Sequence, residues 1–554
     1  MRVLCIFGML CGLWNLAGAL DREAFTFTKY DLEVRLEPEQ HRLGVRGKIT
    51  LRNDSSDSQK DLALQISSSL DWRSIKAGGK PLPFVTEEFN SDLDHTGAFS
   101  EAIVTVPEVP SKGVIELEVG YEGIIPLAAT RLTRMDVPEE KAKHSDWDQI
   151  SKSFTAVRGI GYVTWYPIAT EDASFSDGNS VAETIGRWQA KEGNAEMEVK
   201  FESTSGAAIF FSTPGSPAEH SKGVRFSIVG FGITVPTFVM ADYQKLAAKD
   251  SVAVYYLPGQ QSAAEAYSEV AGQLDPLAPG GSGSGSLQIL ALPDADGQPF
   301  VTEGMLLTPL QSPLTNEAEL SMVYAKGRQW LHSPRAWIED GLAHFAQAEF
   351  IEKQKGRAAA LDYLKAHATV LMEAEKQTSD KPGARDATHS LITAPNDLYL
   401  QTKAMYVWWM LRDMLGRLPV DALRGYRAAE DQEITYLERL IEKTSQRDLQ
   451  WFFDDWVYHD RGLPDFRIDS VYSSPIPTGG FLVTVAVENS GSAGAEVPVT
   501  LEVDGTQISK RLEVRAKSKA SIRIQVPSPP QQVRLNDGSV PESNPSEHVY
   551  TPKG

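Results

Sequence analysis

The fold of this chain is decided by the stretch Trp337-Ile338-Glu339-Asp340-Gly341-Leu342-Ala343-His344-Phe345. It stands within a region of helical periodicity, so it is expected to form a helix. Asp340 and His344 are four residues apart and share one side of that helix. His332 lies on the preceding segment, and these three side chains are a possible ligand set for a metal ion. A histidine on an otherwise apolar helix is, however, more often a core residue than a ligand.

Helical periodicity surrounds this stretch and extends from about residue 257 to about residue 461. One helix is predicted from Tyr399 to Leu415, because Gly416 and Pro419 just after it are typical of a helix end. A second helix is predicted from Leu449 to Tyr458, where the aromatic residues are more typical of a core than of a ligand site. The run from Gly280 to Gly285 predicts a mobile loop, because its spacing fits neither a hydrolase elbow nor a phosphate loop.

On both sides of this helical part, apolar residues alternate with polar ones, which is typical of β-strands with one buried face. The first such region covers about residues 25–243 and predicts a large β domain. The second begins at about residue 468 and predicts a small β-sandwich with turns every eight to twelve residues. The polar, proline-rich residues 541–554 predict a loose tail.

The N-terminus has the pattern of a signal peptide, which we place at residues 1–20. Arg2 precedes an apolar run, and Ala17-Gly18-Ala19 supplies the small residues of a cleavage site. Cys5 and Cys11 are the only cysteines, so the mature chain would have neither disulfides nor thiolate metal ligands. We therefore predict a secreted or periplasmic protein without a membrane span in its mature chain.

The net charge of −20 argues against a nucleic-acid partner, because phosphate binding depends on dense clusters of lysine and arginine. The 554 residues are enough for three or four domains, and the composition is that of an ordinary globular protein. A peptide or another protein therefore remains the partner to consider.

Two further motifs accompany the stretch around Asp340. They are Thr402-Lys403-Ala404-Met405-Tyr406-Val407-Trp408-Trp409-Met410-Leu411, and Leu449-Gln450-Trp451-Phe452-Phe453-Asp454-Asp455-Trp456 followed by Gly462-Leu463-Pro464. With the order of β, helical and β regions, they resemble the membrane alanyl aminopeptidase family of zinc metallopeptidases, the gluzincin aminopeptidases. The resemblance covers most of the mature chain.

The resemblance implies a multidomain α+β fold with an N-terminal β-sheet saddle domain, a thermolysin-like mainly α domain and a C-terminal immunoglobulin-like β-sandwich. We place these three domains at residues 21–245, 246–466 and 467–540.

The zinc chemistry of that family needs an HExxH motif, in which two histidines bind the metal and a glutamate acts as base, and a third acidic ligand on the next helix. Asp340 takes the third-ligand position. One alignment places the motif at Glu317 to Ser321, and the other at Tyr324 to Arg328. Neither contains a histidine, and the second puts a fixed positive charge where a cation ligand is required.

The family's other site positions also differ. The GAMEN-like segment falls at Glu303 to Leu307, so that Leu306 takes the place of the amine-binding glutamate. In the YxKG-like segment, Gln401 takes the place of the tyrosine that would stabilise the oxyanion, unless a two-residue slip makes it Tyr399. The residues that retain the shape of the family's cleft, or equally serve as packing positions, are Gly304, Met305, Trp330, Trp337, Asp340, Gly341 and Lys403.

Three hypotheses follow. The first is a catalytically inactive protein with the aminopeptidase fold that needs no cofactor and either binds a peptide or protein partner or is a structural remnant. The second is an active metalloaminopeptidase whose zinc site is rebuilt around Asp340 and His344, with His332 as a further ligand. The third is an unrelated hydrolase that pairs a serine with His389 or His459, for which no spacing gives support.

Overall fold

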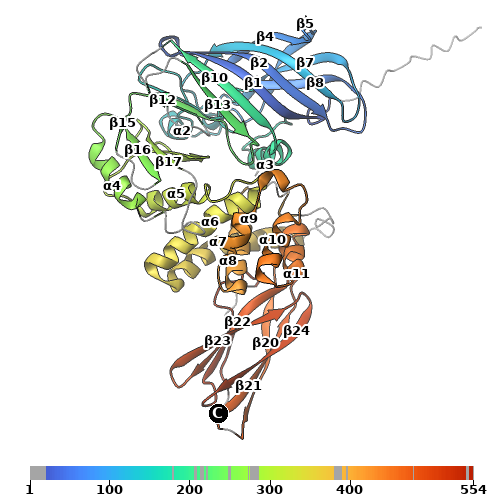
Figure 1. Cartoon of the computed structure of the whole chain (residues 1–554), viewed down its shortest axis with the longest axis vertical. Coiled ribbons are helices and arrows are strands. Elements are labelled where there is room, and N and C mark those ends of the chain that lie inside the picture. The colour runs from blue at the N-terminus through green and yellow to red at the C-terminus, as the bar shows by residue number, and fades with distance from the viewer. Residues whose placement is uncertain are drawn as a thin grey trace, which may run out of the picture.

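The structure is a computed structural model that describes residues 20–177, 180–204, 209–212, 218–219, 223–246, 251–272, 274, 286–379, 390–392, 394, 397–477, 479–544 and 548–552. The described residues form a mixed α+β fold, with mostly strands at both ends of the chain and most helices between them (Figure 1). The predicted signal peptide, the run from Gly280 to Gly285, and His389 lie outside the described residues, apart from Leu20 at the end of that signal.

The N-terminal strands are organised around a seven-stranded sheet of order β13-β10-β1-β2-β8-β4-β5. Within β1, Tyr30, Leu32 and Val34 are buried and the residues between them are not, as the alternating sequence predicts. The strands of this sheet are β1 (Phe25–Glu37), β2 (Arg42–Asn53), β4 (Leu70–Ala77), β5 (Lys80–Pro81), β8 (Val114–Ile124), β10 (Glu196–Ser203) and β13 (Gly223–Val229).

Two smaller sheets and several helices complete this part of the chain. The sheets have the orders β3-β7-β6 and β12-β11-β14-β9. Their strands are β3 (Gln59–Ser67), β6 (Phe84–Asn90), β7 (Ala98–Val109), β9 (Phe154–Val157), β11 (Ile209–Ser212), β12 (Ala218–Glu219) and β14 (Phe238–Ala241). The helices are η1 (Pro38–Gln40), α1 (Thr130–Thr133), α2 (Glu139–Ser145) and α3 (Ser180–Glu192).

Arg22 attaches the beginning of the described chain to the three-stranded sheet. Its Nε and Nη2 donate to the two carboxylate oxygens of Glu101 at 2.8 and 3.0 Å. Glu101 is fully buried, and Gln65 also donates to it, at 2.8 Å. A buried carboxylate is stable only when it is paired, so this bidentate contact holds the N-terminal segment in place.

The middle of the chain begins with a five-stranded sheet of order β15-β16-β17-β19-β18. The three central strands are parallel to one another, and the two outer strands are antiparallel to their neighbours. The elements are β15 (Gln244–Lys245), β16 (Val252–Tyr256), α4 (Gln261–Ala271), β17 (Leu287–Ala291), β18 (Phe300–Thr302) and β19 (Met305–Thr308).

The helices that follow are α5 (Asn316–Gly327), α6 (Ala336–Lys355), α7 (Arg357–Ser379), α8 (Asp397–Leu415), α9 (Val420–Gly425), η4 (Ala428–Glu430), α10 (Tyr436–Ser445), α11 (Gln450–Phe453) and the π-helix η5 (Asp454–Tyr458). The predicted helix from Tyr399 to Leu415 is confirmed and starts two residues earlier. The second predicted helix is also confirmed, but its second half widens into a π-helix.

Two glycines allow the helices of this part to approach closely. A Cβ on Gly327 would lie 2.8 Å from the Cα of Ala343, so α5 and α6 touch there through their backbones. A Cβ on Gly341 would lie 2.6 Å from the Cβ of Ala404, on α8. Trp337 stacks on Trp408 beside this second crossing, with 5.9 Å between ring centroids. α6 therefore lies between α5 and α8 with no room for larger residues at the contacts.

The C-terminal sheets have the orders β20-β21-β24 and β23-β22-β25-β26. Alternate residues of β21 and β22 are buried in one apolar cluster that also includes α6, α8 and η5. The strands are β20 (Phe466–Pro475), β21 (Phe481–Asn489), β22 (Ala495–Val503), β23 (Thr506–Val514), β24 (Ser518–Val526), β25 (Gln532–Leu535) and β26 (His548–Tyr550).

The prediction of a loose tail over residues 541–554 is wrong for much of its described part. β26 pairs with β25, and Glu542 is buried, where it accepts a hydrogen bond from the backbone N–H of Phe466 at 3.0 Å. A polar, proline-rich composition does not reveal that an open strand edge is available for pairing. None of the helices in the described residues is long and apolar enough to cross a membrane.

Candidate functional site

The candidate site lies where α5 ends beside the first half of α6. Thr315 caps the start of α5, accepting a hydrogen bond from the N–H of Ala318 at 3.2 Å, and Arg328 directly follows the end of the helix at Gly327. The close crossing at Gly327 sets the distance between the two helices. Side chains of α5 on this side therefore meet those that α6 carries at positions 339, 340 and 344.

The first group of the site is formed by Tyr324, Asp340 and His344. The hydroxyl of Tyr324 donates to Oδ1 of Asp340, and Oδ2 of Asp340 lies 3.8 Å from Nε2 of His344. Gln347 Nε2 donates to the carbonyl of Leu320, which fixes the orientation of the Gln347 amide. Its Oε1 lies 3.0 Å from Nδ1 of His344 and can only accept a hydrogen bond there. His344 therefore carries a proton on Nδ1.

Burial lowers the pKa of His344, and this effect is larger than the rise caused by Asp340. The imidazole is therefore neutral at pH 7, with a lone pair on Nε2 that faces Asp340. Among the residues that the structure describes, no third zinc ligand joins this pair.

The second group is a buried ion-pair cluster around Glu339, which is 1% exposed. Arg328 Nη2 donates to its Oε1 at 2.9 Å, and the backbone N–H of Ser333 donates to its Oε2 at 3.0 Å. Nδ1 of His332 lies 3.3 Å from the same Oε2 and 4.0 Å from Glu303. Two cations thus face two carboxylates; Arg328 and Glu339 are enclosed, whereas His332 and Glu303 are partly exposed.

The pKa shifts in this cluster agree with that pairing. Burial favours the neutral form of Glu339, but His332 and Arg328 outweigh it and lower the pKa of Glu339. Burial also acts against the charged form of His332, yet Glu339 and Glu303 raise the pKa of His332 to about 9. Both groups are therefore charged at pH 7.

The second of the two alignments, Tyr324 to Arg328, begins and ends with residues that contact α6. In that alignment Tyr324 and Arg328 take the two histidine positions, and they contact Asp340 and Glu339 on α6. In the other alignment Glu317 is exposed on the first turn of α5, and Ser321 has no described contact with Asp340.

The residues present do not fit zinc. A guanidinium has no lone pair to offer a metal, and Arg328 is held in a buried ion pair. His332 faces Glu339 and Glu303 and does not join Asp340 and His344, so the three ligands of the rebuilt site are not brought together. Among the described residues, the one group of three metal-type side chains within ligand range is His144, Asp294 and Asp296.

That last group is explained by protein contacts. Nδ1 of His144 pairs with Asp294 at 2.6 Å, which raises the pKa of His144, and Asp294 also accepts from the N–H of Asp296 at 3.0 Å. The pair of His144 and Asp294 joins α2 to the loop before β18.

The residues predicted to keep the shape of the cleft have packing roles. Gly304 occupies the turn between β18 and β19 with a φ of 74°, a conformation that favours glycine. Met305 and Leu306 lie in β19 and are buried inside the sheet. Trp330 is partly buried between the apolar clusters on either side of α5 and α6.

Lys403 is fully buried on α8 and donates to Asp460, which also accepts from the hydroxyl of Tyr399 at 2.7 Å. Lys403 lies 3.1 Å from that hydroxyl. Tyr399, the alternative candidate for the oxyanion tyrosine, is therefore held in place by the buried pair of Lys403 and Asp460. His459 contacts Asp454 at 2.6 Å, and none of its described contacts is with a serine.

The sequence did not predict the partners of these residues. It also did not predict that buried polar atoms without a hydrogen-bond partner gather in this region. Half of the buried side-chain polar atoms without a hydrogen-bond partner among the described residues lie between positions 328 and 349. They include Arg328 Nε, both amide atoms of Gln329, Trp330 Nε1, His344 Nε2 and Glu349 Oε2. Native proteins leave few such atoms, and each calls for an explanation such as a bound water or ion or a catalytic role.

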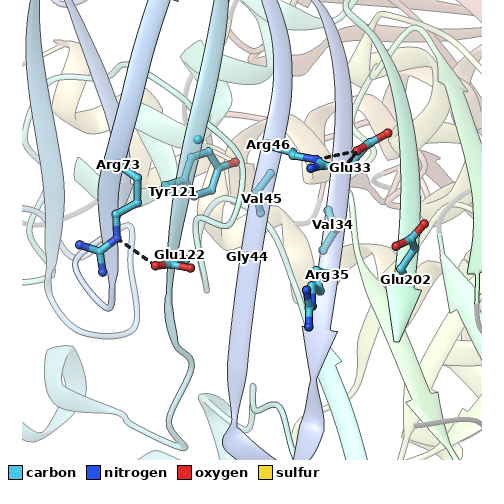
Figure 2. A pocket seen from close by; sticks show the side chains of 11 residues that line it. Glu33, Val34, Arg35, Gly44, Val45, Arg46, Arg73, Tyr121, Glu122 and Glu202 are labelled. Carbon is cyan, nitrogen blue, oxygen red and sulfur yellow. Dashed lines mark hydrogen bonds and ion pairs between the residues drawn. The ribbon is translucent and has the colours of Figure 1, made fainter. Parts of the chain in front are cut away.

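A concavity of about 340 Å³ lies on the seven-stranded sheet, over β1, β2, β8 and β10. Figure 2 shows its charged rim, where Arg46 lies beside Glu33 and Arg73 beside Glu122. Arg35 pairs with Glu37 at 2.9 Å. Every arginine here already has a carboxylate partner, so the concavity offers no unpaired charge to a ligand.

Compared with known protein families and with curated proteins, the chain gives no match.

Proposed function

We propose that this chain is an exported protein with the architecture of the zinc aminopeptidases that binds a peptide or protein partner without zinc catalysis. Its three proposed domains are the saddle domain, the thermolysin-like domain and the immunoglobulin-like sandwich. One observation carries the proposal. The positions that would hold the metal are occupied by Tyr324 and Arg328, whose side chains are bound to the acids of α6.

The physical reason is charge. A divalent ion beside Arg328 would face a guanidinium that keeps its proton at any physiological pH. It would also have to displace contacts that neutralise a buried carboxylate, at a cost of several kcal/mol. The position of the general base is taken by Ala325, which is buried against the neighbouring sheet and has no titratable group.

The test is the metal content of the purified mature chain after dialysis against micromolar zinc and then against buffer. We expect far less than one zinc per chain and no chelator-sensitive hydrolysis of aminoacyl amides. Asp340→Ala is expected to change neither quantity, once circular dichroism shows that the variant is folded. A stoichiometric zinc that disappears in Asp340→Ala would contradict the proposal.

A gain-of-function pair sharpens the test. Tyr324→His with Arg328→His places two imidazoles four residues apart next to Asp340, the spacing that zinc requires. This double variant is expected to retain zinc in the same dialysis. Its matched control is Tyr324→Phe with Arg328→Met, which removes the same contacts without adding a ligand and is expected to stay free of metal.

One observation favours the second candidate, an active enzyme with a rebuilt site. His344 presents an unpartnered Nε2 to Asp340, 3.8 Å away. If wild-type protein retains zinc and loses it in His344→Ala, this candidate replaces the first.

A further inference from the structure

A groove of about 560 Å³ lies between α7 and the C-terminal sheets, and none of the candidate-site residues lines it. One wall is α7, and the other consists of β25, β26 and residues between positions 536 and 542. Its volume lies within the range of pockets that bind ligands. Its apolar lining comes from both walls and includes Leu361, Ala368, Met372, Val540 and Val549.

The α7 wall is one continuous helix face. Ala358, Leu361, Lys365, Ala368 and Met372 all line the groove, at intervals of three or four residues. They are half-buried or exposed, although four of the five are apolar. This face is about 21 Å long, because fourteen residues of helix rise about 1.5 Å each. An elongated ligand therefore fits the groove better than a compact one.

The acids and two of the bases in the groove are already paired. Arg357 contacts Asp537 at 3.2 Å, and His548 contacts Glu542 at 3.0 Å. Lys365 and Arg534 differ, because neither has an acidic partner among the described residues. Arg534 donates to Gln532 at 3.1 Å. The side chains of Lys365 and Arg534 are both exposed.

The two unpaired cations lie on opposite walls, Lys365 on α7 and Arg534 on β25, with apolar residues between them. This arrangement suits a ligand that has both an apolar side and carboxylates. The whole chain carries a net charge of −20, so the preference for an acidic ligand has to come from the local charges of this groove.

We propose that this groove binds an acidic, amphipathic peptide segment of a partner protein. The partner's apolar side chains lie between α7 and β25–β26, and its carboxylates pair with Lys365 and Arg534. The inference rests on the proposed binding function, but on residues that the candidate site does not use.

The experiment uses the full mature chain and two fluorescein-labelled synthetic peptides of fifteen residues. Both have leucines along one helical face; the remaining positions are glutamate in one peptide and lysine in the other. Fluorescence anisotropy measures binding to wild type, to Lys365→Glu with Arg534→Glu, and to Leu361→Ser. The matched control is Lys510→Glu with Arg523→Glu, since both are exposed cations of the C-terminal sheets outside the groove.

We expect wild type to bind the glutamate peptide at least about tenfold more tightly than the lysine peptide. The groove double variant is expected to reverse that preference. Leu361→Ser should weaken binding of the glutamate peptide, whereas the control variant should bind it about as wild type does. Raised salt should reduce the preference, because the charges are exposed.

Three outcomes would overturn the inference. The first is equal affinity of wild type for the two peptides, and the second is equal affinity of the groove variant and the control variant for the glutamate peptide. The third is that dodecanoate displaces the glutamate peptide while neither charge-reversed variant binds that peptide differently from wild type. The last would assign the groove to a small apolar ligand. None of them depends on zinc content or amide hydrolysis, so a failure here is distinguishable from a failure of the proposed function.

Discussion

Arg328 and Glu339 are nearly completely enclosed, with side-chain exposures of 4% and 1%. A buried ion pair is costly to form, because both charges lose their hydration, but it is costlier to break from one side. Removing the guanidinium would leave the carboxylate with the Ser333 N–H and the partly exposed His332. The pair is therefore a sensitive point for stability.

Arg328→Met is expected to lower the free energy of unfolding by about 3–5 kcal/mol, because it leaves Glu339 incompletely neutralised. Adding Glu339→Gln should recover more than half of that loss, because the uncompensated charge is then gone. Chemical denaturation followed by tryptophan fluorescence measures both. The control is Arg439→Met, which breaks an exposed pair with Glu433 and should cost about 1 kcal/mol or less. Equal losses in the two single variants would contradict this account.

At the scale of the element, α6 depends on small residues where it crosses its neighbours. Gly341 is an unfavourable choice for a helix interior by propensity alone, by about 1 kcal/mol relative to alanine. Its place is explained by the contact with Ala404 and Trp408, which a Cβ would meet at 2.6 and 3.1 Å. Close packing therefore outweighs propensity here.

Gly341→Ala is expected to destabilise the protein by about 1–3 kcal/mol, since the methyl group forces α6 and α8 apart. Gly425→Ala is the control, because a Cβ at this helical position meets no atom within 4 Å. Thermal unfolding monitored by circular dichroism compares the two. Adding Ala404→Gly to Gly341→Ala should restore part of the lost stability. If Gly341→Ala alone makes the protein more stable, the steric explanation is wrong.

Most elements could be predicted from local pattern. The period of two in β1, β21 and β22 and the helical period of α8 are properties of neighbouring residues, and all four elements are confirmed. The partners within the site could not be predicted, since Tyr324 meets Asp340 only because Gly327 lets two helices touch. β26 was missed for the same reason: its pairing depends on an edge formed elsewhere in the chain.

At the scale of the whole molecule, His332 joins three parts of the fold. It contacts Glu339 on α6 and Glu303 in the turn between β18 and β19. Its Nε2 also lies beside Gly230, just after β13, where a Cβ would be 4.0 Å away. Thr234, from the same loop as Gly230, donates to Glu303 at 3.1 Å. A single imidazolium thus links the seven-stranded sheet, the five-stranded sheet and the helices.

This link predicts a pH dependence. The pKa of His332 in the folded chain is about 9, above its usual value of about 6.5, so the protonated form binds more strongly in the folded state. Its contribution to stability is present below about pH 6.5 and is lost as the pH rises through 9. Allowing for solvent screening, we expect a loss of about 1–2 kcal/mol over that interval.

The measurement is the difference in unfolding temperature between wild type and His332→Gln at intervals from pH 6 to pH 10. The groups that face His332 are Glu339 and Glu303, with Arg328 on the far side of Glu339. The difference should shrink as the pH rises. A difference that stays constant across this range would show that His332 is not the titrating group.

The contact between Arg22 and Glu101 has a practical consequence for producing this protein. If the signal peptide is removed after Leu20, as proposed, Arg22 is close to the mature N-terminus, and one edge of its guanidinium must reach a fully buried carboxylate. A bulky fusion partner joined directly before Asp21 would compete for the same space. An affinity tag is therefore better placed after a flexible spacer, or at a site where the backbone is free to extend away from the fold.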